Sequence, residues 1–394
     1  MIVTGQQPAV GGGPLYSLVK VAHAVALGRA RGEEVLFWCA SEDHDLGEAG
    51  HADVILRDGT IRRFTADLGP GKASLRFRSA ELWWSGLVAH LRTHLGAGLG
   101  EDFLLRQAPQ EGEGMGRWQA RLLAALFPGL QVAEAFELRP RWAVAMQRAL
   151  DAWPAAELAE LRARLLAEGA ADSFGPLDEA PLFLDLPTGR QPLTTAEVRG
   201  LALADLSPGA ALRPILQQAA LPCTTYVGGP GELAYHRFIT PLYAALGVAR
   251  PELLPRVSLT LLPGWLDRAL ATYGVTEPVL PLTAGTAHLA ADPRLAELDA
   301  VIDGLRADPQ LAGSVRRLEG ERKHLARRLQ RQAERRAGRL SVGVINSYLL
   351  PRNHRQERTM CLCQALWEHG PGLAGVLVAA AAQRQPGEHA FVRV

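Results

Sequence analysis

The apolar positions near the start of the chain change from a short run to a helical period. Ile2 and Val3 suit a short β-strand, and a glycine loop follows at residues 11–13. Six apolar residues then recur at helical spacing: Leu15, Leu18, Val19, Ala22, Val25 and Ala26. Pro14 stands where a helix can begin, because its missing N–H is not needed there. The pattern predicts a strand, a loop and a helix whose N-terminus suits phosphate or carboxylate, with a tight turn that binds nothing as the alternative.

Two later segments repeat this order of strand, polar loop and helix. Residues 35–40 form an apolar run that ends in a dense polar cluster at residues 41–51. Residues 223–227 form another run, which ends in glycines and a proline and leads into apolar positions at helical spacing. Alternating strands and helices indicate a parallel, doubly wound sheet, and such sheets bind ligands at the carboxyl ends of their strands.

The pattern divides the chain into five segments. Residues 1–67 contain the first part of the α/β core and a hairpin predicted around Asp58-Gly59. The other segments are a mostly helical insertion at 68–190, the second part of the core at 191–285, a helical hairpin at 286–340 and a return to the core at 341–394. Helices of the insertion are expected at residues 80–95, 116–126, 139–149 and 155–166. Further strands are expected at residues 253–262 and 342–348.

Residues 293–340 carry an apolar stripe with heptad-like spacing, interrupted at Asp308-Pro309. This predicts two helices in an antiparallel hairpin that docks on the core or pairs with a second subunit. The second helix is rich in arginine, which raises the hypothesis of a nucleic-acid-binding surface. A solvated face with partner acids on the neighbouring helix is favoured, because the formal net charge is only +1 and no aromatic residues interleave the arginines.

Composition excludes several classes of protein. The 394 residues are 48% hydrophobic, and no apolar run approaches the roughly 18 residues of a membrane span. The N-terminus lacks a basic region followed by an apolar signal core, so we expect a cytoplasmic protein. Four cysteines are too few for a disulfide scaffold, and Cys39 and Cys223 lie in apolar strands typical of core thiols. Cys361 and Cys363 would point about 200° apart on a helix, so no joint metal site is expected.

The polar cluster after residues 35–40 is the first candidate site. Its acidic and histidine residues are Glu42, Asp43, His44, Asp45, Glu48 and His51. A histidine beside carboxylates can act as a general base, and a neighbouring carboxylate fixes its tautomer. The same residue types bind metals, but their spacing matches no specific zinc motif and no cysteine pair completes one. We expect catalysis or substrate binding here, with a metal site or a solvated loop as alternatives.

Five blocks of polar and glycine-rich residues stand out along the chain. The first comprises Thr4-Gly5-Gln6-Gln7, Gly13-Pro14-Leu15-Tyr16 and Lys20, and the second comprises Phe37-Trp38 and the polar cluster. The third is Tyr226-Val227-Gly228-Gly229-Pro230-Gly231-Glu232-Leu233-Ala234-Tyr235, and the last two are Pro255-Arg256-x-Ser258 and Gln356-Glu357-Arg358. In order and spacing they resemble the bacillithiol biosynthesis cysteine-adding enzymes, the BshC family. The chain departs from that pattern at Arg352-Asn353-His354-Arg355, where a loop containing glycine or serine is expected.

The resemblance implies a Rossmann-like core similar to that of class I aminoacyl-tRNA synthetases, with inserted connective segments and a coiled-coil hairpin that pairs two subunits. It implies a ligase that adds L-cysteine to the amine of glucosaminyl-malate, forming the amide of the thiol bacillithiol. We expect catalysis by Asp43, His44 and Asp45. Residues expected to bind the substrates or a nucleotide are Thr4, Gly5, Gln6, Gln7, Gly13, Tyr16, Lys20, Glu42, His51, Gly228, Gly229, Glu232, Tyr235, Arg256, Ser258, Gln356 and Arg358.

Amide formation usually requires activation of the carboxylate, for example as an acyl adenylate, because a free carboxylate is a poor acyl donor. No tightly bound cofactor and no metal ligand is expected, and ATP with Mg²⁺ as cosubstrate follows from analogy, because the sequence contains no P-loop. His44 or Asp45 would deprotonate the sugar amine, and Arg256 and Arg358 would neutralise developing phosphate charge.

The expected partners are these small molecules and a second copy of the chain. Two alternatives stay open: a nucleotidyltransferase or sugar-nucleotide enzyme on the same core, and a dimeric module that binds nucleic acid through the arginine-rich hairpin.

Overall fold

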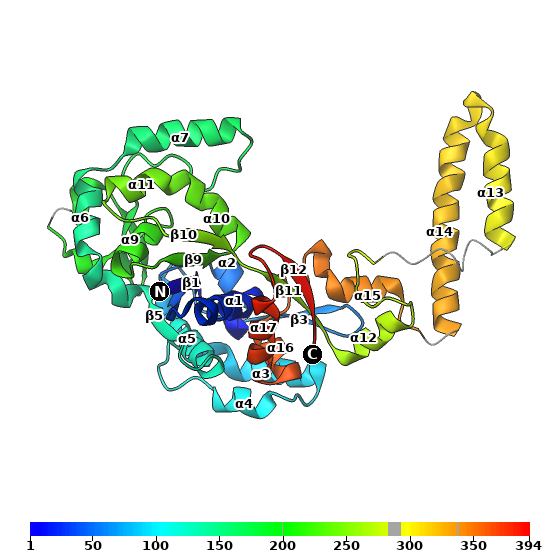
Figure 1. Cartoon of the computed structure of the whole chain (residues 1–394), viewed down its shortest axis with the longest axis horizontal. Helices are drawn as coiled ribbons and strands as arrows, with labels where there is room; N and C mark the ends of the chain where they lie inside the picture. The colour runs from blue at the N-terminus through cyan, green and yellow to red at the C-terminus, as the bar shows by residue number, and fades with distance from the viewer. Residues whose placement is uncertain (199, 283–292, 337–338) are drawn as a thin grey trace.

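A parallel five-stranded sheet forms the centre of the molecule (Figure 1). The computed structural model describes the 394 residues except 199, 283–292 and 337–338. The strands are β1 (Ile2–Gln6), β2 (Val35–Cys39), β5 (Gln131–Glu134), β9 (Thr225–Gly228) and β10 (Glu252–Pro255). Their spatial order is β10-β9-β1-β2-β5, and each neighbouring pair is parallel. Since this order places the first strand between the second and the fourth, it is that of a Rossmann-like sheet, and the predicted core is confirmed.

The two faces of the sheet are covered by different layers, because side chains alternate in direction along a strand. Ile2 and Phe37 face a layer that contains α1 (Tyr16–Arg31), α5 (Met115–Leu126), α16 (Leu362–His369) and α17 (Leu373–Ala382). Val3 and Trp38 face a layer that contains α6 (Ala143–Asp151), α9 (Arg213–Ala220) and α11 (Thr240–Ala245). The sheet is therefore doubly wound, as the alternation of strands and helices predicts.

Three smaller sheets surround the central one. The hairpin predicted around Asp58-Gly59 is confirmed as antiparallel strands β3 (His51–Ile55) and β4 (Ile61–Thr65). Strands β6 (Leu182–Leu186), β7 (Gly189–Leu193) and β8 (Leu206–Pro208) form an antiparallel sheet, and β11 (Ser258–Leu262) pairs in parallel with β12 (His389–Arg393). The single strand expected at residues 253–262 is therefore wrong, because Arg256 and Val257 separate β10 in the central sheet from β11 in another.

The segment expected to be a mostly helical insertion also contributes to the core. It contains the predicted helices as α3 (Glu81–Leu95), α5, α6 and α7 (Ala155–Ala167), together with α4 (Glu101–Arg106). It also contains β5, an edge strand of the central sheet, in which Gln131 pairs with Leu36 of β2. The boundary between core and insertion predicted at residue 68 therefore does not follow the central sheet. The sequence pattern did not reveal β5, because a strand of four residues gives little periodic signal.

Residues 342–348 were expected to be a strand, and this prediction is wrong. They form the helix α15 (Val342–Leu349), whose N-cap Ser341 accepts a hydrogen bond from the backbone N–H of Val344 at 3.2 Å. Val342, Ile345 and Tyr348 are buried at helical spacing. The β-branched residues favoured a strand, but the cap and the burial of one helical face decide the structure.

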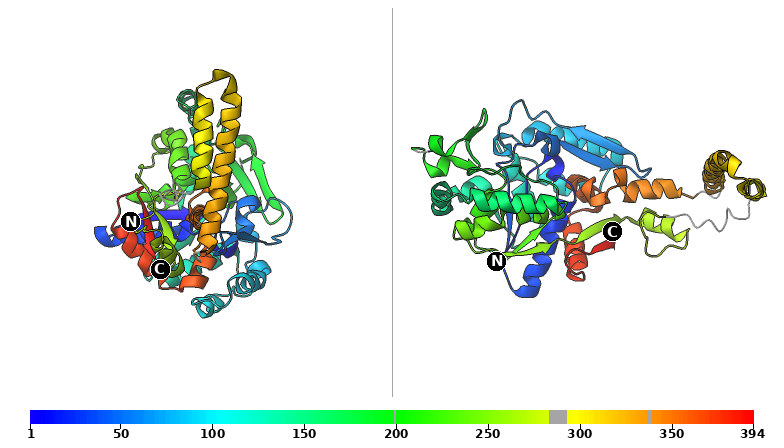
Figure 2. Two further views of the ribbon diagram at one scale, coloured as in Figure 1. Left: turned by 90° about the vertical axis from the view of Figure 1, so that its right-hand side faces the viewer. Right: turned by 90° about the horizontal axis from the view of Figure 1, so that it is seen from above.

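The helical hairpin projects from the rest of the chain (Figures 1 and 2), and near the end of α14 Glu334 accepts a hydrogen bond from the hydroxyl of Tyr273 at 3.2 Å. Helices α13 (Pro293–Arg306) and α14 (Ala312–Arg336) lie side by side. Arg322 on α14 donates to Asp299 on α13 at 2.7 Å, and Arg306 lies 2.8 Å from Glu319. Acidic residues on the neighbouring helix therefore pair with some of the basic ones. No helix in the described ranges is long and apolar enough to cross a membrane.

The remaining helices are short and flank these units. They are α2 (Leu46–Ala49), α8 (Thr195–Val198), α10 (Pro230–His236) and α12 (Gly264–Ala271). The helix predicted after Gly231 is interrupted, since a 3-10 turn (Arg237–Ile239) separates α10 from α11.

Candidate active site

The carboxyl ends of β1, β2 and β9 border a cavity of about 470 Å³. At this point β1 has β2 on one side and β9 on the other, so the order of the sheet reverses here. Open α/β sheets bind ligands at such a topological switch point. The expected site residues that line the cavity are Gly5, Gln6, Gln7, Tyr16, Lys20, Asp43, Gly229, Glu232, Tyr235, Arg256 and Arg358. The sequence blocks therefore converge on one place.

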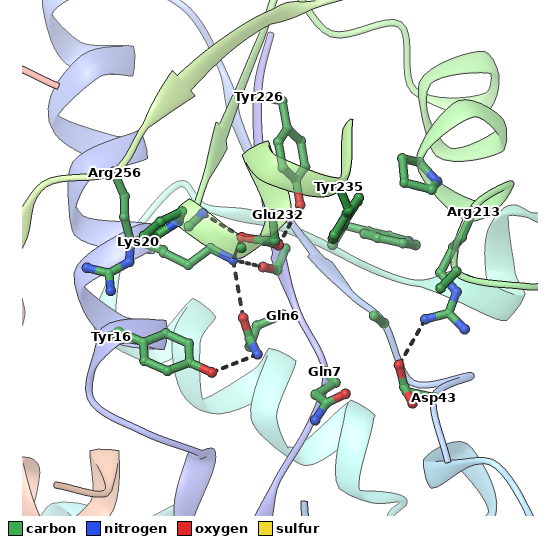
Figure 3. A pocket seen from close by; sticks show the side chains of 18 of the residues that line it. Gln6, Gln7, Tyr16, Lys20, Asp43, Arg213, Tyr226, Glu232, Tyr235 and Arg256 are labelled. Carbon is green, nitrogen blue, oxygen red and sulfur yellow. Dashed lines mark hydrogen bonds and ion pairs between the residues drawn. The ribbon is translucent and has the colours of Figure 1, made fainter. Parts of the chain in front are cut away.

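Lys20 from α1 and Glu232 from α10 form an ion pair in the cavity wall (Figure 3). Lys20 Nζ lies 2.7 Å from Glu232 Oε2 and also donates to the carbonyl oxygen of Gly5. Glu232 accepts further hydrogen bonds from the backbone N–H of Gly229 at 2.6 Å and from the hydroxyl of Tyr226 at 3.2 Å. Burial lowers the pKa of Lys20, and the carboxylate of Glu232 opposes that shift. The pair joins the sequence blocks that follow β1 and β9.

Tyr16 begins α1, and its hydroxyl lies between Gln6 and Glu48. It accepts a hydrogen bond from Gln6 Nε2 at 3.2 Å and donates one to Glu48 Oε1 at 3.2 Å. Burial raises the pKa of Tyr16, and the charge of Glu48 raises it further, so the phenol remains a donor. Loss of water around its carboxylate raises the pKa of Glu48 as well. A raised pKa suits a carboxylate that accepts a proton near neutral pH.

Arg256 follows β10 and is held in place by Glu357. Its Nη1 lies 2.8 Å from Glu357 Oε1, and the hydroxyl of Ser258 donates to the same oxygen at 2.7 Å. Gln356 Oε1 accepts from a backbone N–H of β11 at 2.9 Å. Ser258 and Gln356 were expected to bind ligands, but they lie outside the cavity lining. They attach the turn at residues 356–358 to β11, which brings the exposed Arg358 to the cavity.

Asp43 lies across the cavity from Lys20 and pairs with Arg213 (Figure 3). Its Oδ1 accepts from the backbone N–H groups of His44 at 2.7 Å and Asp45 at 3.2 Å, and its Oδ2 lies 3.2 Å from Arg213 Nη1. Burial alone would raise the pKa of Asp43, but the Arg213 charge and the two N–H donors outweigh it and lower the pKa. Asp43 is therefore ionised at neutral pH.

Glu42, His44 and Asp45 of the polar cluster are outside the cavity lining. Glu42 is fully buried, where its Oε1 accepts from Arg139 at 2.6 Å and its Oε2 accepts from Ser207 at 2.9 Å. The His44 ring Nδ1 lies 3.4 Å from Nη1 of Arg190, and burial with this positive charge lowers the pKa of His44. Asp45 caps α2 by accepting from the backbone N–H of Glu48 at 3.1 Å. His44 and Asp45 thus contact the cavity residue Asp43 through their backbone.

Four further expected site residues have backbone or packing positions. The Thr4 hydroxyl donates to the carbonyl of Val227 at 2.8 Å, which links β1 to β9, and Gly228 accepts from the N–H of Arg256 at 2.9 Å. His51 begins β3. Gly13 has a φ of 74° and accepts a hydrogen bond from the Leu362 N–H at 2.8 Å.

The first glycine loop packs against the C-terminal part of the chain. A Cβ built on Gly12 would lie 3.2 Å from the Leu362 side chain, and one on Gly11 would lie 3.1 Å from Ala52. Both glycines have positive φ, so a larger residue would be strained as well as crowded. These glycines therefore permit a close turn before α1, and they do not line the cavity.

Sequence reasoning missed several residues that line the cavity. They are Ala40, Ser173, Phe174, Ala210, Arg213 and Pro214. Trp38, Tyr226, Pro230 and Gly231 belong to the sequence blocks and Glu48 to the polar cluster, but none of them was expected individually to bind a ligand. Arg213 carried one usable signal, since it precedes Pro214, a residue that suits the first turn of a helix, and the two begin α9. Nothing in the sequence placed that helix opposite Asp43.

No group of histidine, cysteine, aspartate and glutamate is placed to hold a metal ion in the ranges that the structure describes. The predicted core location of Cys39 and Cys223 is confirmed, because both are free and buried, and Cys361 and Cys363 are free and buried as well. Burial raises the pKa of the Cys39 thiol, and the same cause raises that of Cys363. Neither thiol is therefore suited to act as a nucleophile.

The fold and the cavity define a Rossmann-like protein with a charged cavity at the switch point of its sheet. The family model of the BshC N-terminal Rossmann-like domain, described as bacillithiol biosynthesis, matches residues 1–139 and 201–257. The chain is 31% identical over 457 residues to "Putative cysteine ligase BshC" of Koribacter versatilis, with 100% of this chain and 84% of that protein covered. The protein of the same name from Solibacter usitatus is 28% identical, with 94% and 80% covered. The chain belongs to the BshC family.

A solved structure, the glutamate-tRNA synthetase of Elizabethkingia anophelis, has a TM-score of 0.28 and 14% identity, with 71% of this chain and 55% of that chain covered. This similarity is too low to support an argument about the core.

Proposed function

We propose that the chain is a ligase that joins L-cysteine to the amine of glucosaminyl-malate and so forms bacillithiol. The observation that carries the proposal is the convergence of separate family blocks on one cavity, at Gln6, Lys20, Asp43, Glu232 and Arg256. The chain is a family member over its whole length, and its relatives bear the name of cysteine ligases. A charged cavity at a sheet switch point suits two small polar substrates.

Activation of the cysteine carboxylate is the first chemical requirement. When bound with Mg²⁺, ATP would supply the leaving group, so that cysteine, glucosaminyl-malate and ATP give the amide, AMP and pyrophosphate. The residues present suit a polyanion, because Arg256 and Arg358 line the cavity beside Lys20 and the site opens to solvent at Arg358. We assign to Arg256 and Arg358 the neutralisation of negative charge that develops on a phosphate.

Removal of a proton from the sugar amine is the second requirement. Of the three residues expected to be catalytic, Asp43 lines the cavity, and His44 and Asp45 support it through backbone N–H groups. Asp43 has a lowered pKa and is a weak base, whereas the pKa of Glu48 is raised. We therefore assign proton removal to Glu48 and retain Asp43 as the contact to a substrate ammonium group.

We also propose that two copies of the chain pair through α13 and α14. Leu295 and Ile302 are buried between these helices, but Val301 is 52% exposed and would be covered by a partner. Sedimentation of the full chain is expected to give a dimer, and Val301→Asp is expected to weaken it. A monomer at micromolar concentration would contradict this proposal.

The ligase assay combines the purified chain with glucosaminyl-malate, L-cysteine, ATP and Mg²⁺, followed by thiol labelling and mass spectrometry. We expect bacillithiol in the complete mixture and none when cysteine or ATP is omitted. Pyrophosphate release that does not require cysteine would favour the nucleotidyltransferase alternative. A folded protein that forms no product in the complete mixture would reject the proposed function.

A further inference from the structure

The cavity has two ends with different charge patterns (Figure 3). Lys20 and Arg256 lie at one end, beside Tyr16, and the Arg256 guanidinium stands 5.3 Å above the Tyr16 ring. Asp43 and Arg213 lie together at the other end. The two substrates of a ligase must bind side by side, so each end can be matched to one of them by its chemistry.

Arg213 is buried and incompletely hydrogen-bonded. Its side chain is 8% exposed, and Nη1 contacts Asp43 Oδ2 at 3.2 Å. Its Nε is buried without a hydrogen-bond partner among the described residues. A guanidinium has five N–H donors, and a buried donor without a partner is costly. Since Arg213 lines the cavity, an acceptor supplied by a ligand would satisfy it.

Asp43 supplies the opposite charge at the same place. Two backbone N–H groups fix its Oδ1, and only Oδ2 turns toward Arg213. A simple anion near Arg213 would be repelled by Asp43, and a simple cation near Asp43 would be repelled by Arg213. A small molecule with an ammonium and a carboxylate on the same carbon finds a partner for each charge.

We infer that Asp43 and Arg213 form the subsite for the α-amino acid, with Asp43 binding its ammonium and Arg213 its carboxylate. This inference rests on the proposed function, and it names the end of the cavity at which cysteine binds. The cavity also has apolar walls, because Trp38, Phe174 and Pro214 line it, and Pro214 directly follows Arg213. Such walls accept a thiol-bearing side chain and disfavour a charged one.

The second substrate suits the opposite end better. Glucosaminyl-malate carries two malyl carboxylates, which need more than one cation. Lys20 lines this cavity together with Arg256 and Arg358, the two cations assigned above to the phosphate. Lys20 and Arg256 each pair with an acidic residue, and Arg358 forms no ion pair among the described residues. Arg213 alone, beside an ionised Asp43, would serve a dicarboxylate poorly.

Calorimetry on the full chain tests the subsite without turnover. We would titrate L-cysteine, cysteamine, which lacks the carboxylate, and 3-mercaptopropionate, which lacks the amine. L-cysteine is expected to bind about 10- to 100-fold more tightly than either analogue, because each lacks one charge-assisted hydrogen bond. Equal affinity for all three would overturn the inference.

The steady-state kinetics of variants then test which end of the cavity binds cysteine. Arg213→Gln is expected to raise the KM for cysteine about 10- to 100-fold and to leave the KM for glucosaminyl-malate unchanged. Arg213→Lys is expected to recover part of the loss, because it restores the charge but not the planar fork. Arg121→Gln is the matched control, since Arg121 pairs with Glu113 at 2.8 Å outside the cavity lining.

The two ways of failing are distinguishable. A wild-type chain that binds cysteine as described but makes no bacillithiol would refute the ligase proposal and support the subsite. A rise in the KM for glucosaminyl-malate alone in Arg213→Gln would overturn the subsite and leave the ligase proposal standing.

Discussion

Two carboxylates of one short loop lie in environments that shift their pKa values in opposite directions. Asp43 accepts two backbone N–H groups and faces Arg213, which together lower its pKa. Glu48, five residues later, loses water at the cavity wall, and its pKa rises. Such a pair can have two different roles in one site, because one carboxylate stays charged while the other exchanges a proton.

Replacement of Glu48 by Gln tests this division. We expect kcat to fall about 100-fold or more, because a general base typically contributes that much. In the wild type, kcat/KM should rise with pH as Glu48 loses its proton, and this rise should lie above the ordinary glutamate pKa of 4.5 because the pKa of Glu48 is raised. The rise should be absent in Glu48→Gln.

The measurement is kcat/KM from pH 4.5 to 8 for the wild type and the variant. Glu111→Gln is the control, since Glu111 is exposed and outside the cavity lining. Persistence of the same acid limb in Glu48→Gln would assign it to another group.

Residues near strand ends were the ones that sequence could locate in the site. Gln6 ends β1 and Gly229 follows β9, and the carboxyl ends of these two strands meet at the switch point in any sheet of this order. Arg213 could not be found in this way, because it reaches Asp43 from 170 positions away and belongs to no recognised block. The orientation of the His44 ring could not be predicted from the sequence either, because it depends on a turn in the polar loop that directs the ring toward Arg190.

At the scale of elements, a buried ionic network joins the loop after β2 to the sheet of β6, β7 and β8. Arg139 lies 2.6 Å from Glu42 and 2.9 Å from Asp185, and Arg76 lies 2.7 Å from Asp185. Glu42 directly precedes Asp43. The network therefore fixes the start of the loop that carries the proposed amino-acid subsite.

Arg139→Leu should destabilise the chain strongly. It removes the guanidinium and leaves Glu42, which is fully buried, without its charged partner. Loss of one member of a buried pair costs about 3–5 kcal/mol. We would compare chemical unfolding of this variant with that of Arg162→Leu, whose partner Asp172 is solvent-accessible and whose loss should change little. Equal midpoints for the two variants would show that the buried network does not stabilise the fold.

The elements that sequence misjudged were those that tertiary contacts decide. Residues 342–348 are rich in β-branched side chains, yet they form α15 because Ser341 caps it and one face is buried. Tertiary contacts also fix residues 352–355, where the chain departs from the family pattern. Arg352 and Asn353 have φ values of 54° and 62°, a conformation that favours glycine, and Arg352 Nη1 is held 2.8 Å from Asp53.

At the scale of the whole molecule, the two ends of the chain complete one unit. The N–H of Leu15 donates to the carbonyl of Met360 at 2.7 Å, and Pro14 pairs with Cys361. The first glycine loop is therefore fixed by the segment that carries Arg358. The Rossmann-like core could be predicted from the repeated strand–loop–helix order, but this closure could not, because no periodic pattern records which distant segments pair.

Buried histidines in both layers make the stability of the molecule depend on pH. His23 lies in α1, where its Nδ1 accepts from the N–H of Val257 at 3.2 Å, and burial lowers its pKa from 6.5 to about 4. His236 lies at the end of α10, and burial likewise lowers its pKa to about 4. Both residues are less than 5% exposed. The folded chain therefore keeps both imidazoles neutral in mildly acidic solution.

The sign of the effect follows from proton binding. Between pH 6.5 and 4 the unfolded chain binds protons at His23 and His236 that the folded chain does not, so the free energy of unfolding falls as the pH falls. Each histidine contributes up to about 3 kcal/mol over this range.

We expect His23→Gln to be less stable than the wild type at pH 7, because the Val257 N–H loses its acceptor, but to lose less stability on going to pH 5. Thermal midpoints at the two pH values measure this, with the exposed His324 as control in His324→Gln. If His23→Gln and His324→Gln lost the same amount of stability between pH 7 and 5, protonation of His23 would not be the cause of the pH dependence.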